Sequence, residues 1–359
     1  MKRLRVKSSL FDYQIVMGRG AWRSIREIDP SRYSAAIVLT EQKIWRCWGR
    51  AFQIAVELKH ASVIFVPPGE ASKSLKMVER VTNELTERGA DRRSLLIAFG
   101  GGMVGDLAGF VASIYMRGID FIQIPTTVLA QVDSSIGGKT GVDVGASKNV
   151  VGTFYPPRIV LADPMVLSSL DVRTFRSGLF EVVKHAFLAG GPLYKLLEKR
   201  IDELAPSGSR DLDLVLALAA EVKVEVVNRD EREAGLRRVL NLGHTLGHAI
   251  EEASGYRRFL HGEAVGWGML CAIRLATLLG CLPPDQAEKM AALIRRAGPL
   301  PSIGGLRVPK LIRLLPRDKK AVGGRIHWVI PRAIGKVVVT ADVPLELAAR
   351  AFREVQRTP

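Results

Sequence analysis

The chain of 359 residues contains little cysteine and few aromatic residues. Its three cysteines, Cys47, Cys271 and Cys281, are far apart and form no C-x-x-C pair, which excludes a disulfide framework. They are typical of reduced residues, so we expect a cytoplasmic protein. Aromatic residues make up 6% of the chain and are not interleaved with basic tracts, which argues against a nucleic-acid-binding surface.

Secretion signals and long hydrophobic runs are also missing. The basic stretch MKRLRVKSS is followed by no apolar run or small-residue cleavage site, so it predicts no signal peptide. The most apolar late segment, 265–282, is interrupted by Arg274 and several glycines. That pattern is typical of a packed helix, so we expect no membrane span and no membrane partner.

Positive charge is what the chain has in excess. It has 52 Lys and Arg against 36 Asp and Glu, a net charge of +16, with 47% hydrophobic residues. The hydrophobic fraction of 47% and the charged fraction of 25% are those of an ordinary globular protein. Because the basic residues are spread along the chain without a dense tract, they favour a small phosphorylated substrate over nucleic acid. A basic binding module is the non-enzymatic alternative.

The first half of the chain alternates between strand-like and helix-like patterns. Short apolar, β-branched runs lie at 35–40, 62–68, 94–102, 120–125 and 158–163. Amphipathic stretches lie between the early runs, at 43–58 and 72–87. This alternation predicts a Rossmann-like α/β domain over residues 1–170, with a parallel sheet and helices on both faces.

Longer helical periods dominate the second half. They lie at 194–204, 212–227, 244–252, 262–279 and 285–297. We therefore expect a mainly α-helical second domain over residues 171–359, and two domains suit a chain of this length.

A glycine-rich segment, AFGGGMVGDLAGF at 98–110, joins a strand-like run to a helix-like one. Glycines there let the backbone approach a pyrophosphate, whose charge is favoured at a helix N-terminus. The spacing is not G-x-G-x-x-G, so the local pattern leaves open a nucleotide site or a packed strand exit. Asp106 could bind a ribose hydroxyl, but its local pattern favours a helix cap.

The following segment, 124–152, is dense in hydroxyl groups and glycine and carries Asp133, Lys139 and Lys148. Lysine charge and backbone N–H donors together suit an anion. We expect this segment to contribute to a binding site.

Three of the six histidines lie within a short stretch of the second half. His244 and His248 are four residues apart and share one face of a helix, and His261 follows after a break. Zinc favours imidazole and carboxylate ligands, and catalytic sites use three protein ligands. Spacing alone nominates His244, His248 and His261, with an acid elsewhere.

Glu181 and Lys184 lie three residues apart in the apolar segment SGLFEVVKHAF. A surface ion pair would have the same spacing. The flanking apolar residues, however, predict burial, and buried charges need a metal, an anion or each other.

Taken together, these segments resemble the 3-dehydroquinate synthase family of sugar phosphate cyclases. The resemblance covers roughly residues 60–335 and is carried, in the family's order, by GGGMVGDLAGFVASIYMRGIDFIQIPTTVLAQVDSSIGGKTGVD, FEVVK, RRVLNLGHTLGHAIE, HGEAVGWGM and DKK. It implies a carbon–oxygen (phosphate) lyase of the shikimate pathway to chorismate and aromatic amino acids. The implied reaction converts 3-deoxy-D-arabino-heptulosonate 7-phosphate to 3-dehydroquinate and phosphate by transient oxidation, phosphate elimination, re-reduction and aldol closure.

The resemblance also implies cofactors and site residues. The metal ligands would be Glu181, His244 and His261, holding Zn²⁺ or Co²⁺, so a carboxylate replaces His248 in the set. NAD⁺ would be bound by Glu70, Lys73, Gly101, Gly102, Gly105, Asp106, Thr126, Thr127, Lys139, Lys148, Ser169 and Leu170. The substrate phosphate and carboxylate would meet Lys139, Asn149, Lys184, Lys223, Arg237, Asn241 and Lys320. Asp133 and His248 would handle protons, and Arg117 would reach the neighbouring subunit's site in a homodimer.

One departure and two related alternatives accompany the resemblance. Where the family usually reads T-L-P, this chain has Ser169-Leu170-Asp171, in which serine keeps the hydroxyl. A 2-deoxy-scyllo-inosose synthase or a polyol dehydrogenase would share much of the pattern. Arg237 and Asn241, which suit a carboxylate-bearing ligand, favour dehydroquinate synthase.

Overall fold

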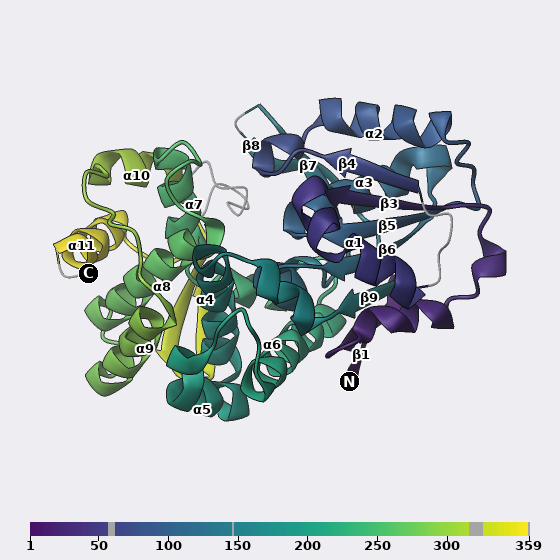
Figure 1. Cartoon of the computed structure of the whole chain (residues 1–359). Helices are drawn as coiled ribbons and strands as arrows, with labels where there is room; N and C mark the ends of the chain where they lie inside the picture. Colours follow the sequence, from purple (N-terminus) through teal and green to yellow (C-terminus); the bar gives the residue numbers. More distant parts are fainter. Residues whose placement is uncertain (57–61, 146, 316–325, 358–359) are drawn as a thin grey trace. The chain divides into compact units, whose positions relative to one another are not determined.

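The computed structural model describes residues 1–56, 62–145, 147–315 and 326–357 (Figure 1). Contacts divide the chain into two compact units. Unit 1 comprises Met1–Asp171 and Ala205–Glu231, and unit 2 comprises Val172–Leu204 and Arg232–Pro359.

Unit 1 is built on a seven-stranded sheet in the order β1-β2-β9-β6-β5-β3-β4. β1 and β2 pair antiparallel, and all other neighbours pair parallel. The strands are β1 (Lys2–Lys7), β2 (Asp12–Met17), β3 (Ala36–Glu41), β4 (Ser62–Val66), β5 (Leu95–Gly100), β6 (Asp120–Pro125) and β9 (Ile159–Ala162). All five predicted apolar runs form strands, and the predicted parallel sheet is confirmed.

Helices cover both faces of this sheet, as the alternating pattern predicts. The helical elements are η1 (Ala21–Glu27), η2 (Pro30–Arg32), α1 (Gln42–Val56), η3 (Glu70–Ser72), α2 (Leu75–Glu87), α3 (Gly102–Ile114), η4 (Tyr115–Arg117), η5 (Ala130–Ser134) and η6 (Pro164–Ser169). Successive strand residues point to opposite faces. In β3, Ile37 and Leu39 pack with α2 and α3, whereas Val38 packs with η1 and α1.

Two further elements complete unit 1. The hairpin of β7 (Lys139–Val144) and β8 (Ser147–Phe154) is antiparallel. Helix α6 (Arg210–Arg229) is tied to unit 1 by Lys2, whose Nζ lies 2.5 Å from Glu221 Oε1. The sequence pattern places this helix in the second domain, but the structure assigns it to unit 1. An amphipathic period shows that a helix has a buried face, not which core covers it.

Unit 2 is mainly helical, as predicted. Its elements are α4 (Val172–Ala189), α5 (Gly191–Arg200), η7 (Ile201–Glu203), η8 (Leu236–Asn241), α7 (His244–Ala253), α8 (His261–Leu278), α9 (Pro284–Ala297), α10 (Val308–Leu314), β10 (Trp328–Ala333), β11 (Lys336–Thr340) and α11 (Leu345–Arg357). The antiparallel pair β10 and β11, drawn in yellow among green helices in Figure 1, was not predicted.

Helix α8 packs closely on its neighbours because glycines remove side chains at the contacts. A Cβ at Gly262 would lie 1.8 Å from Ser177 O of α4, and one at Gly268 would lie 1.8 Å from Gly243 O. Gly243 precedes α7 directly. These glycines bring the backbones of α4, α7 and α8 together, and with them the segments that carry the predicted ligands.

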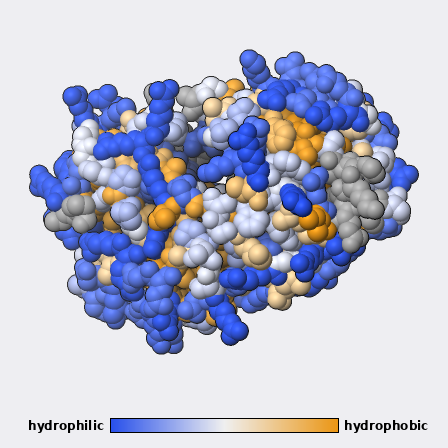
Figure 2. Space-filling view, viewed as in Figure 1, coloured by the Kyte–Doolittle hydropathy of each residue, from blue (hydrophilic) through white to orange (hydrophobic). Residues whose placement is uncertain are grey.

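The face shown in Figure 2 is mostly hydrophilic, with smaller apolar areas between the polar ones. Among the described residues, no helix is both long enough and apolar enough to span a bilayer. The three cysteines are free thiols, and burial raises the pKa of Cys271 above its ordinary value.

We predict that Gly268→Ala destabilises unit 2, because its methyl group would overlap Gly243 O. Overpacking of this kind costs about 1–3 kcal/mol, and more where the neighbour is backbone. The loss should appear as a lower midpoint in thermal unfolding followed by circular dichroism. Gly304→Ala is the control, because its methyl would meet only the flexible Ser302 hydroxyl, at 3.1 Å. Equal midpoints for the two variants would contradict the packing argument.

Candidate functional site

The glycine-rich segment forms the turn between β5 and α3 in unit 1. β5 ends at Gly100, and Gly101 is the N-cap of α3. A Cβ at Gly101 would lie 3.2 Å from Thr127 Cγ2, and one at Gly102 would lie 2.9 Å from Ser134 Oγ. Glycine therefore lets the turn pass close to its neighbours. No side chain caps the N-terminus of α3, which leaves its backbone N–H groups to a ligand such as a pyrophosphate.

Asp106 lies inside α3, so the hypothesis that it caps this helix is wrong. Its Oδ2 accepts a hydrogen bond from Lys73 Nζ at 2.9 Å, and Glu70 Oε1 lies 3.3 Å from the same ammonium. Burial lowers the pKa of Lys73, but the charges of Asp106 and Glu70 outweigh this and raise it above its ordinary value. Lys73 is therefore a buried cation that stays charged.

The residues that follow β6 lie at the same edge of the sheet as the glycine turn. β5 and β6 are parallel, so their carboxyl ends coincide. Thr126 N donates to Gly100 O at 2.9 Å, and Thr127 Oγ1 accepts from Ala130 N at 3.1 Å. A Cβ at Gly105 would lie 2.8 Å from Gln123 Oε1, so this glycine leaves room for the Gln123 amide between α3 and β6.

The hairpin of β7 and β8 is attached to the segment that carries Lys73. Asp143 N donates to Lys73 O at 2.8 Å, and Asn149 N donates to Asp143 Oδ1 at 2.7 Å. Asn149 has a φ of 52°, in the left-handed region. Lys148 Nζ lies 3.9 Å from Glu70 Oε1. Four residues predicted to bind the nucleotide or the substrate thus belong to one network.

Asp133 and Lys223 form an ion pair within unit 1, and both are largely buried. Asp133 lies in η5, a turn of π-helix, which is a rare conformation often found at functional sites. Lys223 comes from α6, 90 residues later in the chain. The structure brings together a predicted proton carrier and a predicted anion-binding lysine. Lys139, the first residue of β7, is exposed.

Ser169 and Leu170 follow β9 at the end of η6. Ser169 Oγ accepts from Trp48 Nε1 at 3.0 Å and donates to Val166 O at 2.8 Å. The serine hydroxyl is thus engaged inside unit 1. Its role in cofactor binding, and that of Leu170, stays a prediction.

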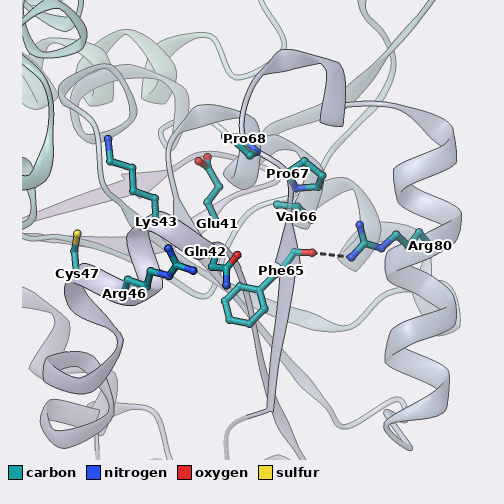
Figure 3. A pocket seen from close by; sticks show the side chains of 10 residues that line it. All are labelled: Glu41, Gln42, Lys43, Arg46, Cys47, Phe65, Val66, Pro67, Pro68 and Arg80. Carbon is teal, nitrogen blue, oxygen red and sulfur yellow. Dashed lines mark hydrogen bonds between the residues drawn. The ribbon is translucent and has the colours of Figure 1, made fainter.

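A cavity of about 560 Å³ opens at the carboxyl ends of β3 and β4 (Figure 3). It is lined by Glu41, Gln42, Lys43, Arg46, Cys47, Phe65, Val66, Pro67, Pro68 and Arg80. Arg80 Nη2 donates to Phe65 O at 2.9 Å, the dashed line in Figure 3. Burial raises the pKa of the Glu41 carboxyl. Because β3 pairs with β5, this cavity lies on the same edge of the sheet as the glycine turn.

Unit 2 gathers a carboxylate and two imidazoles around one point. Glu181 of α4 is fully buried, and its Oε1 lies 3.7 Å from His244 Nε2 and 3.6 Å from His261 Nε2. The three ligand atoms lie within 4.8 Å of one another. Neither Glu181 oxygen accepts a hydrogen bond of normal geometry from the described residues. A buried carboxylate facing two imidazole nitrogens fits a divalent metal such as Zn²⁺.

Lys184 lies one turn after Glu181 and forms an ion pair with its Oε2. Its side chain is 1% exposed, so the predicted burial of this pair is confirmed. His244 Nδ1 lies 3.2 Å from Leu242 O. Because a carbonyl only accepts, this contact places the His244 proton on Nδ1 and leaves Nε2 with its lone pair.

His248 lies one turn after His244 on α7, with its ring centre 5.5 Å from that of His244. Spacing nominated His244, His248 and His261 as ligands, but this trio is not among the groups of described residues whose ligand atoms converge within 4.8 Å. Spacing along a helix shows which residues share a face, but it does not determine where each ring nitrogen points. The set implied by the family resemblance does converge.

The start of α8 is fixed by Glu263, which was not among the predicted site residues. Glu263 Oε2 accepts from Leu260 N at 2.8 Å, and Arg173 Nε donates to Glu263 Oε1 at 2.6 Å. His261 is the first residue of α8. The Glu three residues after the N-cap is a recognisable capping pattern, so a signal for this role was present.

Arg237 is 2% exposed and lies in η8, together with Asn241. Asn241 Nδ2 donates to Glu233 Oε1 at 2.7 Å, and Glu233 has a φ of 61°. Glu233 therefore orients a predicted substrate residue. It was missed because an isolated loop acid has no periodic signal. Lys320, also predicted, lies outside the described residues.

We predict that Glu181→Gln greatly weakens Zn²⁺ binding, because an amide cannot supply the negative charge that the buried group contributes. The loss of affinity should exceed the roughly 10- to 100-fold that removal of an outer partner costs. Competition with a chromophoric chelator measures it. Glu252→Gln, on α7 but outside the ligand group, is the control. Wild-type affinity in Glu181→Gln would contradict the assignment.

Comparisons with known proteins agree over most of the chain. Residues 63–177 match the 3-dehydroquinate synthase N-terminal family, and residues 178–321 match the 3-dehydroquinate synthase C-terminal family. A 3-dehydroquinate synthase from Solibacter usitatus is 41% identical over 342 residues, 95% of this chain and 96% of that protein. One from Dictyoglomus turgidum is 44% identical over 334 residues, 92% of both chains.

Solved structures show the same arrangement of elements. The 2-epi-5-epi-valiolone synthase from Streptomyces hygroscopicus subsp. jinggangensis, with NAD⁺ and Zn²⁺ bound, has a TM-score of 0.88 at 26% identity, covering 99% of this chain and all of that one. A 2-deoxy-scyllo-inosose synthase complexed with carbaglucose-6-phosphate, NAD⁺ and Co²⁺ has a TM-score of 0.86 at 25% identity, covering 98% and 99%. With both family models matched in order and relatives matched over more than nine-tenths of their length, this chain belongs to the 3-dehydroquinate synthase family.

Proposed function

We propose that this chain is an enzyme that converts 3-deoxy-D-arabino-heptulosonate 7-phosphate to 3-dehydroquinate and phosphate, a carbon–oxygen lyase reaction. The observation that carries the proposal is 41–44% identity to 3-dehydroquinate synthases over nearly the whole chain. The buried group of one carboxylate and two imidazoles supports it independently. NAD⁺ and a divalent metal, Zn²⁺ or Co²⁺, are the proposed cofactors, as in the solved cyclases.

When bound, NAD⁺ would supply a hydride acceptor that is regenerated, and the metal would supply a Lewis acid for the substrate hydroxyls. Glu181, His244 and His261 would hold the metal, since their ligand atoms converge. The charge of Glu181 would partly neutralise the cation, while the imidazoles would bind it without adding charge. Three protein ligands would leave room at the metal for a substrate oxygen.

The nucleotide candidates lie at one edge of the unit 1 sheet. The glycine turn would take the pyrophosphate at the N-terminus of α3. Asp106 and Glu70, held by Lys73, would accept hydrogen bonds from ribose hydroxyls. The cavity beside β3 and β4, with Phe65 and two prolines in its lining, offers apolar surface for the adenine.

The substrate carries a carboxylate and a phosphate, and the proposed anion-binding residues are cationic. Lys184 and Arg237 of unit 2 are almost completely buried, so charge-assisted hydrogen bonds to an anion would be strong there. Asn241, oriented by Glu233, would add a neutral donor. Lys139, Lys148, Asn149 and Lys223 are the corresponding candidates of unit 1.

Asp133 and His248 are the proposed proton carriers. The Lys223 ammonium beside Asp133 favours the ionised carboxylate, the form that accepts a proton. The imidazole of His248 can either donate or accept a proton. Either group would act on a substrate hydroxyl through hydrogen-bond contact or one water.

The cytoplasmic location expected from the cysteines stays a prediction.

We expect chelator-treated protein to release phosphate from the heptulosonate phosphate only after NAD⁺ and Zn²⁺ or Co²⁺ are both restored. NADH should not accumulate, because the hydride returns to the substrate. A phosphate assay and absorbance at the NADH band measure both quantities in one reaction.

The alternatives predict other results in the same assay. Phosphate release from glucose 6-phosphate but not from the heptulosonate phosphate would move the chain to the inosose synthases. NADH that accumulates without phosphate release would indicate a polyol dehydrogenase. Identity to the dehydroquinate synthases exceeds that to the inosose synthase, 44% against 25%, which favours the first result.

We also propose that the chain forms a homodimer in which Arg117 serves the site of its partner. Met116 and Arg117 have φ values of 50° and 69°, a left-handed pair that costs non-glycine residues about 1–3 kcal/mol each. Exposed apolar side chains lie at the end of α3, in this turn and on β8: Ile114, Met116, Val150 and Phe154, each at least 42% exposed. Thr153 Oγ1 donates to Ser113 Oγ at 2.9 Å, which joins α3 and β8 into one surface. A second copy of the chain would cover it.

Hybrid dimers test this arrangement. We predict that Arg117→Ala and Lys184→Ala are each inactive but that a refolded equal mixture recovers about one quarter of wild-type activity, because half of the dimers are hybrids with one complete site. Size-exclusion chromatography checks that the variants remain dimeric. No recovery in the mixture would mean that Arg117 acts within its own subunit or not at all.

A further inference from the structure

Glu251 is a buried acid next to the metal group that the proposed reaction does not use. It lies on α7 and is 3% exposed. Its Oε2 lies 3.3 Å from His261 Nδ1. A carboxylate only accepts hydrogen bonds, so this contact places the His261 ring proton on Nδ1.

The other nitrogen of the same ring faces the metal group. His261 Nε2 lies 3.6 Å from Glu181 Oε1. With the proton on Nδ1, Nε2 keeps the lone pair that a metal ion requires. We infer that Glu251 is a positioning residue, which holds His261 in the tautomer and ring orientation that bind the divalent cation. The inference rests on the proposed metal centre.

The Nδ1 atoms of the two proposed histidine ligands contact different groups. His244 is held by Leu242 O, a neutral carbonyl two residues away at 3.2 Å. His261 is held by a charged group from another helix, and a carboxylate also raises the basicity of its ligand. His261 is the more exposed ring, 31% against 12% for His244. With less packing around it, His261 depends more on its partner.

A competing role exists for the same side chain. Glu251, His248 and His261 also have ligand atoms within 4.8 Å of one another, so Glu251 could bind a cation directly. A ligand and a positioning residue respond differently to substitution. Loss of a ligand removes the metal, whereas loss of an outer partner typically weakens binding about 10- to 100-fold.

Glu251→Met and Glu251→Gln form a matched pair. Both remove the charge at similar side-chain length, but only glutamine keeps an oxygen that accepts from Nδ1–H. We expect Glu251→Met to weaken Zn²⁺ and Co²⁺ binding about 10- to 100-fold and Glu251→Gln to weaken it less. Chelator competition on the full chain gives the affinities, and circular dichroism of the metal-free variants checks the fold. Glu252→Met, the next residue of α7, should keep wild-type affinity.

Two results would overturn the inference. One is wild-type affinity in Glu251→Met. The other is a loss as complete as in Glu181→Gln, with a changed Co²⁺ absorption spectrum in Glu251→Gln, which would make Glu251 a ligand. If Glu251→Met does not fold, Glu251→Asp gives the same test, because its shorter carboxylate withdraws from Nδ1. These affinities decide the inference whether or not the chain turns over the heptulosonate phosphate. A wild-type chain that binds neither metal overturns it together with the proposed centre.

Discussion

The burial of one carboxylate constrains unit 2 more than any other interaction. Glu181 is removed from water, and an ionised group in that position costs several kcal/mol unless positive charge compensates it. Lys184 supplies one charge from the next turn of α4. Two imidazole nitrogens face the same carboxylate and supply lone pairs, not charge. A divalent cation satisfies the carboxylate and both imidazoles together, which explains why the apolar helix α4 carries Glu181.

Close helix packing makes this convergence possible, because short side chains such as imidazole and carboxylate reach one point only from nearby backbones. Gly262 and Gly268 let α8 approach α4 and the turn before α7. Glu263 then fixes the first residue of α8. Unit 1 also pairs a buried charge with groups of opposite charge. Lys73 lies between Asp106 and Glu70, at the sheet edge that carries the residues proposed to bind the nucleotide.

Hydrophobic periodicity predicted the strands and helices, because these depend on residues that are close together in the sequence. The five apolar runs of unit 1 form strands, and α7 and α8 begin at His244 and His261. Features that depend on long-range contact were not visible in periodicity. Spacing favoured His248 as a ligand, because no residue close to His244 in the sequence indicates that Glu181 lies opposite it. The family resemblance supplied Glu181. The same limit explains the misplaced helix α6, whose partner is the N-terminal strand, and the wrong cap at Asp106, whose partner is Lys73. Periodicity did not identify Glu251 either, since its contact with His261 joins two helices.

X-ray absorption spectroscopy of the zinc-loaded chain tests the central claim most directly, because it counts ligands by type. The account predicts two imidazole nitrogens at about 2.0–2.1 Å and one carboxylate oxygen at about 2.0–2.2 Å, with the remaining position held by water. Three imidazoles, or a sulfur ligand at about 2.3 Å, would contradict it, because Glu181 would then not be the residue around which the site is built.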